Sequence, residues 1–349
     1  MCILTHLLIY IDDMGEKLFF LLFCVFVTLS CNRKDYERIE CSIKTMEGKI
    51  RVLDTSIIKE IYYPYDIYSV GDDILVINKD KDNEVMYQYN SELSFKGAFF
   101  SYGRAGNEFT FVGRSLRDGT DSTLFLYTDW FNCTKFSLDD HGVSVADKFR
   151  ILNDAQNDVI ILNDSLVFYR ALQKNDPFHV YNYVSDELVC EFGEFPKSSI
   201  EPETDADRDN ICLFNSVYNR INGLLVSFYE SIPIIRIYDM VTYDLVREIQ
   251  IIDSEKQTAS LDGYYEGEGV VYFLRPVITA KNIYSLFLNT RSDDEFIEQT
   301  ILMKMDLNGN LVSKYVLDRF CPIYTVSNDG IFYGISMSNG EYVLCKTHL

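Results

Sequence analysis

Short apolar runs separated by polar turns recur along the chain, and the clearest group lies at Val70–Phe100. Within it, Ile74–Asn78 is apolar and rich in β-branched residues, and Glu84–Tyr89 alternates between apolar and polar side chains. Runs of this length are too short for helices and predict strands joined by tight turns. With Tyr65–Val70 before it and Leu93–Phe100 at its end, the group predicts one four-stranded antiparallel sheet.

The second strand of this group returns five more times. The copies are Thr123–Tyr127, Ser165–Tyr169, Leu224–Phe228, Ile283–Leu288 and Ile331–Ile335. Four-stranded units repeating every 45–50 residues or so are typical of β-propeller blades. We interpret the longer spacing toward the C-terminus as loop insertions. The predicted fold class is all-β, a six-bladed β-propeller of four-stranded antiparallel blades, and the alternative is a β-sandwich or two smaller β domains.

The last unit is incomplete, because the chain ends after Glu341–Lys346 with no outer strand. A suitable strand, Gly48–Leu53, is left over at the other end of the ring region. We expect it to lie beside Tyr342–Cys345 and to complete the last blade, since a closed ring leaves no exposed sheet edge at the seam.

The N-terminus begins with a short charged stretch and an apolar run, Leu18–Leu29, that is too short to span a bilayer. It ends in Thr28-Leu29-Ser30-Cys31, which resembles a bacterial lipoprotein signal with Cys31 as the lipidated residue. The expected organisation is a signal peptide at 1–30 with a true start at Met14, a tether at 31–45 and a propeller at 46–349. This places the protein in the cell envelope, anchored by lipid to the outer membrane. An uncleaved single anchor reading from Ile3 is the alternative.

The formal net charge of −21 argues against nucleic acid and against an anionic membrane surface as partners. The chain contains 25 Tyr and 24 Phe, and packing between sheets explains this aromatic content without a sugar-binding platform. A protein or an oligosaccharide in the envelope remains as the expected partner.

No metal or cofactor is predicted. The six cysteines beyond the leader show no ligand spacing, so we interpret them as free thiols, most of them buried. Asp205, Asp207 and Asp209 alternate as in a calcium loop, but Asn210 and Ser216 stand where that loop needs a glycine and an acid. We therefore interpret Glu201–Asn210 as a solvated acidic loop.

The insertions at 193–212, 253–269 and 289–296 should share one face of the ring, where function usually sits. Aligning the ends of the second strands places Arg114 and Arg275 at the mouth of the central channel, where two guanidinium groups suit a carboxylate or a sulfate. The candidate ligand-binding residues are Arg104, Arg114, Trp130, Tyr229 and Arg275. The alternative is that each arginine pairs with a loop carboxylate and that Trp130 packs under a loop.

The segment Ser101–Phe109, SYGRAGNEF, resembles the turn between the first two blades of TolB-like and NHL-like six-bladed propellers, which are common among exported lipoproteins. The resemblance implies a six-bladed ring with a lipid anchor and no assigned reaction. We expect a non-catalytic binding or scaffold protein. A metal-dependent hydrolase or lyase similar to six-bladed lactonases is the alternative, so the question of catalysis stays open.

Overall fold

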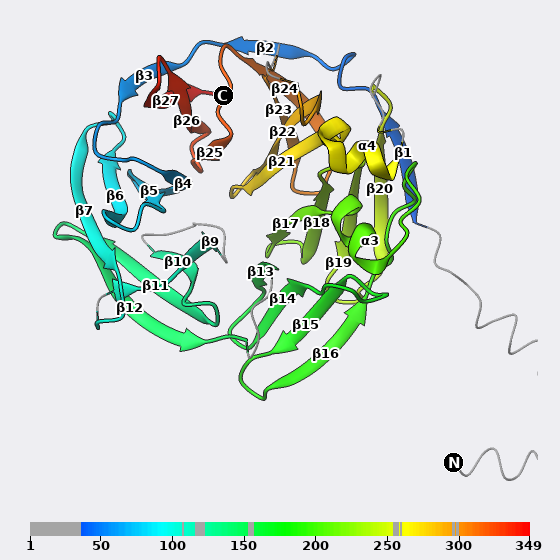
Figure 1. Cartoon of the computed structure of the whole chain (residues 1–349), viewed down its shortest axis with the longest axis horizontal. Helices are drawn as coiled ribbons and strands as arrows, with labels where there is room; N and C mark the ends of the chain where they lie inside the picture. The colour runs from blue at the N-terminus through cyan, green and yellow to red at the C-terminus, as the bar shows by residue number, and fades with distance from the viewer. Residues whose placement is uncertain are drawn as a thin grey trace, which may run out of the picture. The chain divides into compact units, whose positions relative to one another are not determined.

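The computed structural model of the protein describes residues 36–106, 108–115, 123–152, 157–253, 258, 260–294, 297 and 300–349. Six small sheets surround a central axis, as Figure 1 shows. The predicted all-β class and six-bladed propeller are confirmed. The N-terminal signal and Cys31 lie outside the described residues.

Each of the first three blades is a sheet of four consecutive strands, with the first strand innermost. Blade 1 contains β4 (Pro64–Val70), β5 (Asp73–Asn78), β6 (Glu84–Asn90) and β7 (Phe95–Tyr102), with the short β8 (Glu108–Phe109) added at its edge. Blade 2 contains β9 (Val112–Ser115), β10 (Thr123–Thr128), β11 (Asn132–Asp139) and β12 (Gly142–Arg150). Blade 3 contains β13 (Asn157–Ile161), β14 (Leu166–Arg170), β15 (Phe178–Asn182) and β16 (Glu187–Phe192).

The other three blades take strands from both ends of the chain. Blade 4 contains β17 (Phe214–Asn219), β18 (Leu224–Tyr229), β19 (Ile234–Asp239) and β20 (Leu245–Ile251). Blade 5 contains β21 (Val270–Ile278), β22 (Asn282–Arg291), β23 (Thr300–Asp306) and β24 (Leu311–Leu317). Blade 6 contains β25 (Ile323–Val326), β26 (Ile331–Ser338) and β27 (Glu341–His348) from the C-terminal end.

The ring closes through an N-terminal strand, but not through the predicted one. β3 (Asp54–Ile57) pairs antiparallel with β27, with Thr55 opposite Cys345. β2 (Gly48–Arg51) instead runs parallel to β24 on blade 5, so placing Gly48–Leu53 beside Tyr342–Cys345 was wrong. The apolar pattern of that segment misled the prediction, because Ile50 and Val52 are 75% and 72% exposed.

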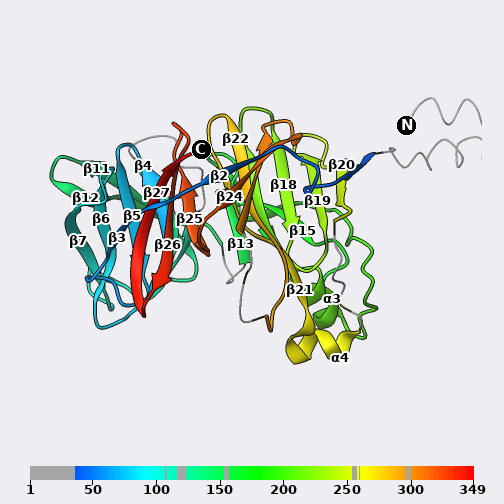
Figure 2. The same ribbon diagram turned by 90° about the horizontal axis from the view of Figure 1, so that it is seen from above.

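A further strand, β1 (Glu37–Cys41), lies along β20 at the edge of blade 4. The segment from β1 to β3, residues 37–57, therefore follows the outer edges of blades 4, 5 and 6 in turn, as the blue ribbon in Figures 1 and 2 shows. We call it the N-terminal belt. The predicted tether at 31–45 thus overlaps a strand of the folded domain.

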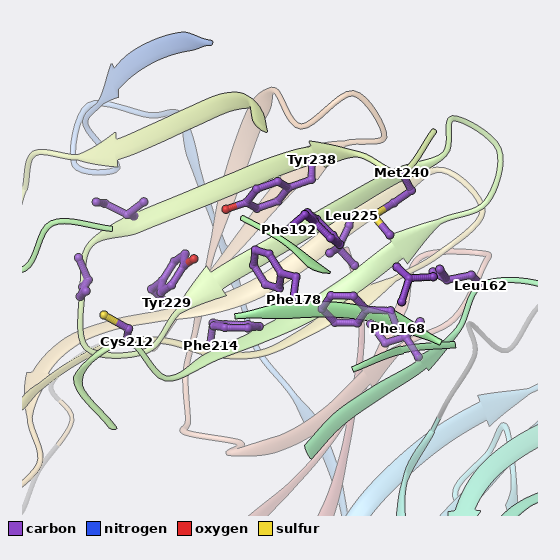
Figure 3. Packing of buried hydrophobic residues seen from close by; sticks show 14 of the residues in the cluster. Leu162, Phe168, Phe178, Phe192, Cys212, Phe214, Leu225, Tyr229, Tyr238 and Met240 are labelled. Atoms are coloured by element: carbon purple, nitrogen blue, oxygen red, sulfur yellow. The ribbon is translucent and has the colours of Figure 1, made fainter. Parts of the chain in front are cut away.

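Aromatic and aliphatic side chains fill the spaces between the blades. Between blades 3 and 4, the ring of Phe178 meets those of Phe214 and Tyr238 at centroid distances of 5.0 and 4.7 Å in edge-to-face geometry. Figure 3 shows this cluster with Tyr229, Phe214 and Cys212 side by side. The predicted use of the aromatic residues in sheet packing is consistent with these contacts.

Two insertions form short helices, which the sequence pattern did not predict. The acidic segment is the helix α3 (Asp205–Ile211) rather than a loop, and Thr204 caps it through a reciprocal contact with Asp207. The helix α4 (Leu261–Gly263) and the π-helical turn η1 (Tyr264–Glu268) follow in the next insertion. The Tyr265 hydroxyl donates to Asp207 at 2.6 Å, so the two insertions brace each other on one face, where Figure 2 shows α3 and α4.

Candidate functional site

A cavity of about 680 Å³ occupies the central channel of the ring. Its volume lies within the range of small-molecule pockets, about 300–1,000 Å³. The first strand or the segment beside it in every blade contributes a lining residue: Asp66, Arg114, Asp158, Asn215, Arg275 and Tyr324. The wall therefore carries both guanidinium and carboxylate groups.

Arg275 reaches across the channel from blade 5 to blade 1. One of its terminal nitrogens, Nη1, donates to Asp66 Oδ1 at 2.9 Å, and Nη2 donates to the carbonyl oxygen of Tyr65 at 2.9 Å. The other oxygen of Asp66 accepts from the Tyr68 hydroxyl at 3.0 Å, and that hydroxyl accepts from the Ser115 amide at 2.8 Å. This network ties blades 1, 2 and 5 together across the cavity.

A second network runs from blade 2 to blade 4. Arg114 donates to the side-chain oxygen of Asn215, and the Asn215 amide group donates to the carboxylate of Glu230. Burial raises the pKa of Glu230, although the hydrogen bond from Asn215 and the charge of Arg114 act in the opposite direction. Arg114 and Arg275 thus serve as cross-channel ties as well as lining residues.

Asp158 brings a buried carboxylate to the start of β13. Its Oδ1 accepts a long hydrogen bond of 3.5 Å from the Ser216 amide, and its Oδ2 has no hydrogen-bond partner in the part of the chain that the structure describes. Burial raises the pKa of Asp158 to about 6, against the lowering effect of Arg170 and Arg114. Part of this carboxylate is therefore protonated in mildly acidic solution.

Two stacked aromatic rings lie at the cavity lining near the β10–β11 turn. The Trp130 ring lies 4.0 Å from that of Phe111 with an angle of 16° between their planes, and Trp130 is 48% exposed. Trp130 has a φ of 70°, and the preceding Asp129 anchors the turn by accepting from the Thr110 amide at 2.8 Å. An exposed, supported indole face suits stacking against a ring-shaped ligand.

The five residues suggested by the sequence separate into two groups. Arg114, Trp130 and Arg275 line the cavity. Tyr229 is 0% exposed and packs in the core between blades 3 and 4, as Figure 3 shows, and Arg104 is an exposed residue of the turn after blade 1. Arg275 pairs with a carboxylate, as in the alternative interpretation, but that carboxylate belongs to Asp66, which is in a strand and not in a loop.

Seven other charged residues of the cavity were not among the candidates: Asp66, Asp72, Asp158, Arg170, Arg220, Glu230 and Asp329. Glu230 directly follows Tyr229, the last residue of β18, and it lines the cavity, whereas Tyr229 packs in the core. Asp158 and Arg170 lie at the facing ends of β13 and β14, a relation that only the strand register reveals.

The carboxylates of the cavity lie close to its arginines. Among the described residues, no group of three or more His, Cys, Asp or Glu side chains is arranged to hold a metal ion. Asp66 pairs with Arg275, and Asp158 and Glu230 both feel the charges of Arg114 and Arg170. A divalent cation would compete with these guanidinium groups.

None of the helices in the described part of the chain has the length and apolar character that a bilayer crossing requires.

Fold and cavity together define a six-bladed propeller with a polar central channel. The chain is similar to a "Putative exported protein" from Bacteroides fragilis, with a TM-score of 0.53 and 9% identity over 90% of this chain and 100% of that one. It is also similar to a member of the DUF4221 family from Bacteroides vulgatus, with a TM-score of 0.57 and 10% identity over 85% and 98%. At these identities the likeness shows the fold. No family model and no curated protein matches the chain.

Proposed function

We propose that this chain is an exported, lipid-anchored binding protein that holds an oligosaccharide in its central channel without acting on it chemically. The observation that carries the proposal is the cavity of about 680 Å³ with a stacked Trp130–Phe111 pair beside a wall of hydrogen-bonding groups. Sugar sites combine these elements, because the apolar face of a pyranose stacks on an indole while its hydroxyls need both donors and acceptors.

An oligosaccharide suits this site better than a folded protein, which is the other partner that the net charge of the chain did not exclude. A concave cavity of this volume admits a small ligand, whereas protein interfaces are broad and bury about 800 Å² on each partner. The lactonase-like alternative is less well supported, since the carboxylates of the channel lie beside arginines.

Two observations support the proposal of export and lipid anchoring. The N-terminal leader resembles a lipoprotein signal ending at Cys31, and the similar structure from Bacteroides fragilis is named a putative exported protein. Two or more acyl chains on one cysteine hold a protein stably on a membrane. The TolB-like and NHL-like resemblance stays a prediction that fits the same picture.

Replacing Trp130 with asparagine is expected to weaken saccharide binding by about tenfold or more, because the ligand loses its stacking surface. Asparagine tolerates the positive φ of this position, so the melting temperature should hold. Binding is measured on an array of immobilised oligosaccharides and then by calorimetry. Trp130→Phe, which keeps a ring, is the matched control. Suppose that no oligosaccharide on the array binds, and that the wild-type protein instead captures an envelope protein that Trp130→Asn does not capture. The ligand would then be a protein and not a saccharide.

Expression of the full chain with an alkyne-bearing fatty acid is expected to label the protein, and Cys31→Ser should remove the label. Cys41→Ser, a change in a nearby cysteine of the folded domain, should leave the label in place. Label is measured by gel fluorescence after coupling to a dye. Label that persists in Cys31→Ser would contradict the anchor.

A further inference from the structure

Four arginines line the cavity, and three of them, Arg114, Arg170 and Arg275, differ in what their side chains contact. Arg275 is held by Asp66 and the Tyr65 carbonyl, and Arg114 is held by Asn215. The side chain of Arg170, at the end of β14, makes neither a hydrogen bond nor an ion pair to another described residue, and its Nε atom is buried without a partner among them. Of these three, Arg170 is therefore the arginine whose side chain has no hydrogen-bond acceptor among the described residues.

The position of Arg170 is fixed by packing instead of by a carboxylate. Its guanidinium carbon lies 5.6 Å from the centroid of the Phe214 ring, and both residues line the cavity. Phe214 is itself buried in the core between blades 3 and 4. A guanidinium that rests on an aromatic face while its N–H groups lack acceptors is preorganised for a planar anion.

The neighbouring acids do not occupy Arg170. Asp158 is close enough for its charge to be felt, yet its Oδ2 lacks a partner among the described residues. Glu230 accepts from Asn215. Among the described residues, Arg170 thus offers donors without acceptors, and Asp158, at the start of the neighbouring strand β13, offers an acceptor without a donor.

A ligand that satisfies both needs a carboxylate for Arg170 and a hydroxyl donor for Asp158. A neutral sugar supplies only the hydroxyl, and a simple carboxylate supplies only the acceptor. A uronic acid carries both on one ring, and its apolar face suits the stacked pair of Trp130 and Phe111.

We propose that the channel ligand is an acidic saccharide whose uronate carboxylate is bound by Arg170 and whose adjacent hydroxyl donates to Asp158. This assignment rests on the proposed saccharide function and names the ligand class for the same cavity.

Calorimetric titration of the purified protein with a panel of uronic-acid disaccharides, each paired with the neutral disaccharide of the same linkage, tests the assignment. At least one uronate is expected to bind about tenfold to a hundredfold more tightly than its neutral counterpart, the usual advantage of a charge-assisted bidentate contact. Arg170→Gln should reduce that preference to within about twofold. Arg170→Lys should retain only part of it, because an ammonium group lacks the planar fork. Arg104→Gln, a change in an exposed arginine outside the cavity, should have no effect.

The possible failures are distinguishable. Neutral disaccharides that bind as tightly as the uronates, or a uronate preference that survives in folded Arg170→Gln, would overturn the role of Arg170 and leave the saccharide function standing. Binding of a tripeptide with a free carboxyl terminus, with no binding by any saccharide of the panel, would overturn both proposals. Far-ultraviolet circular dichroism and the melting temperature of each variant establish that a lost preference comes from the site and not from unfolding.

Discussion

Replacing Ser56 with proline is expected to lower the free energy of unfolding by about 2–4 kcal/mol, because it removes a ladder hydrogen bond at the closure of the ring and leaves a carbonyl of β27 without a partner. The Ile58 amide donates to the Tyr342 carbonyl at 3.1 Å, and Ser56 lies opposite Leu344 in the same antiparallel register. Since hydrogen-bonded pairs alternate along such a ladder, the Ser56 amide also faces β27. Urea denaturation followed by circular dichroism measures the change.

Thr55→Pro is the matched control for Ser56→Pro. Thr55 is the next residue of the same strand, and its amide points away from β27 at the outer edge of blade 6. Proline is tolerated on edge strands at such positions, so the loss should stay below about 1 kcal/mol. Equal losses in the two variants would show that β3 is not held by its ladder with β27.

Replacing Asp158 with asparagine is expected to stabilise the protein by about 2 kcal/mol at pH 7.5 and to change little near pH 4. Burial raises the pKa of Asp158 to about 6, so the folded protein binds this proton more strongly than the unfolded chain does. The cost of the buried charge is fully present above pH 6 and disappears as the pH falls through 6 toward 4. Asparagine has no charge, keeps an acceptor for the Ser216 amide and tolerates the φ of 52°.

Urea denaturation at a series of pH values measures this effect. Asp72→Asn, a change in an exposed aspartate at the cavity lining, is the control and should leave stability within about 0.5 kcal/mol at both pH values. A gain for Asp158→Asn that is the same at pH 4 and pH 7.5 would refute the account, because a packing effect does not follow the titration of a carboxyl group.

The six second strands were predictable because their central residues are mostly buried and apolar, as in Leu75–Ile77 of β5. The strand that closes the ring, β3, could not be predicted. Asp54–Ile57 is an edge strand with mostly exposed side chains, so it carries no apolar pattern. Helix α3 was also missed, since its seven residues are too short to show an apolar stripe.

The candidate site was predictable only in part. Arg114 and Arg275 could be placed in the channel because strand ends align from blade to blade. Their partners Asn215 and Asp66 lie across the ring, more than a hundred residues away, and no local pattern connects such positions. Arg170 ends a second strand, and the alignment of second-strand ends was used only to locate residues of the first strands.

The N-terminal belt determines the order in which the molecule can be completed. The ribosome synthesises the belt strands β1, β2 and β3 before any blade. Their neighbours lie in the second half of the sequence: β20, β24 and β27. Contacts between such distant parts of a chain form slowly, so the earliest segment waits with its backbone unpaired until synthesis is nearly finished. A product that stops short of β27 leaves β3 without its neighbour, and blade 6 then lacks two of its four strand positions, although β1 and β2 keep their partners β20 and β24.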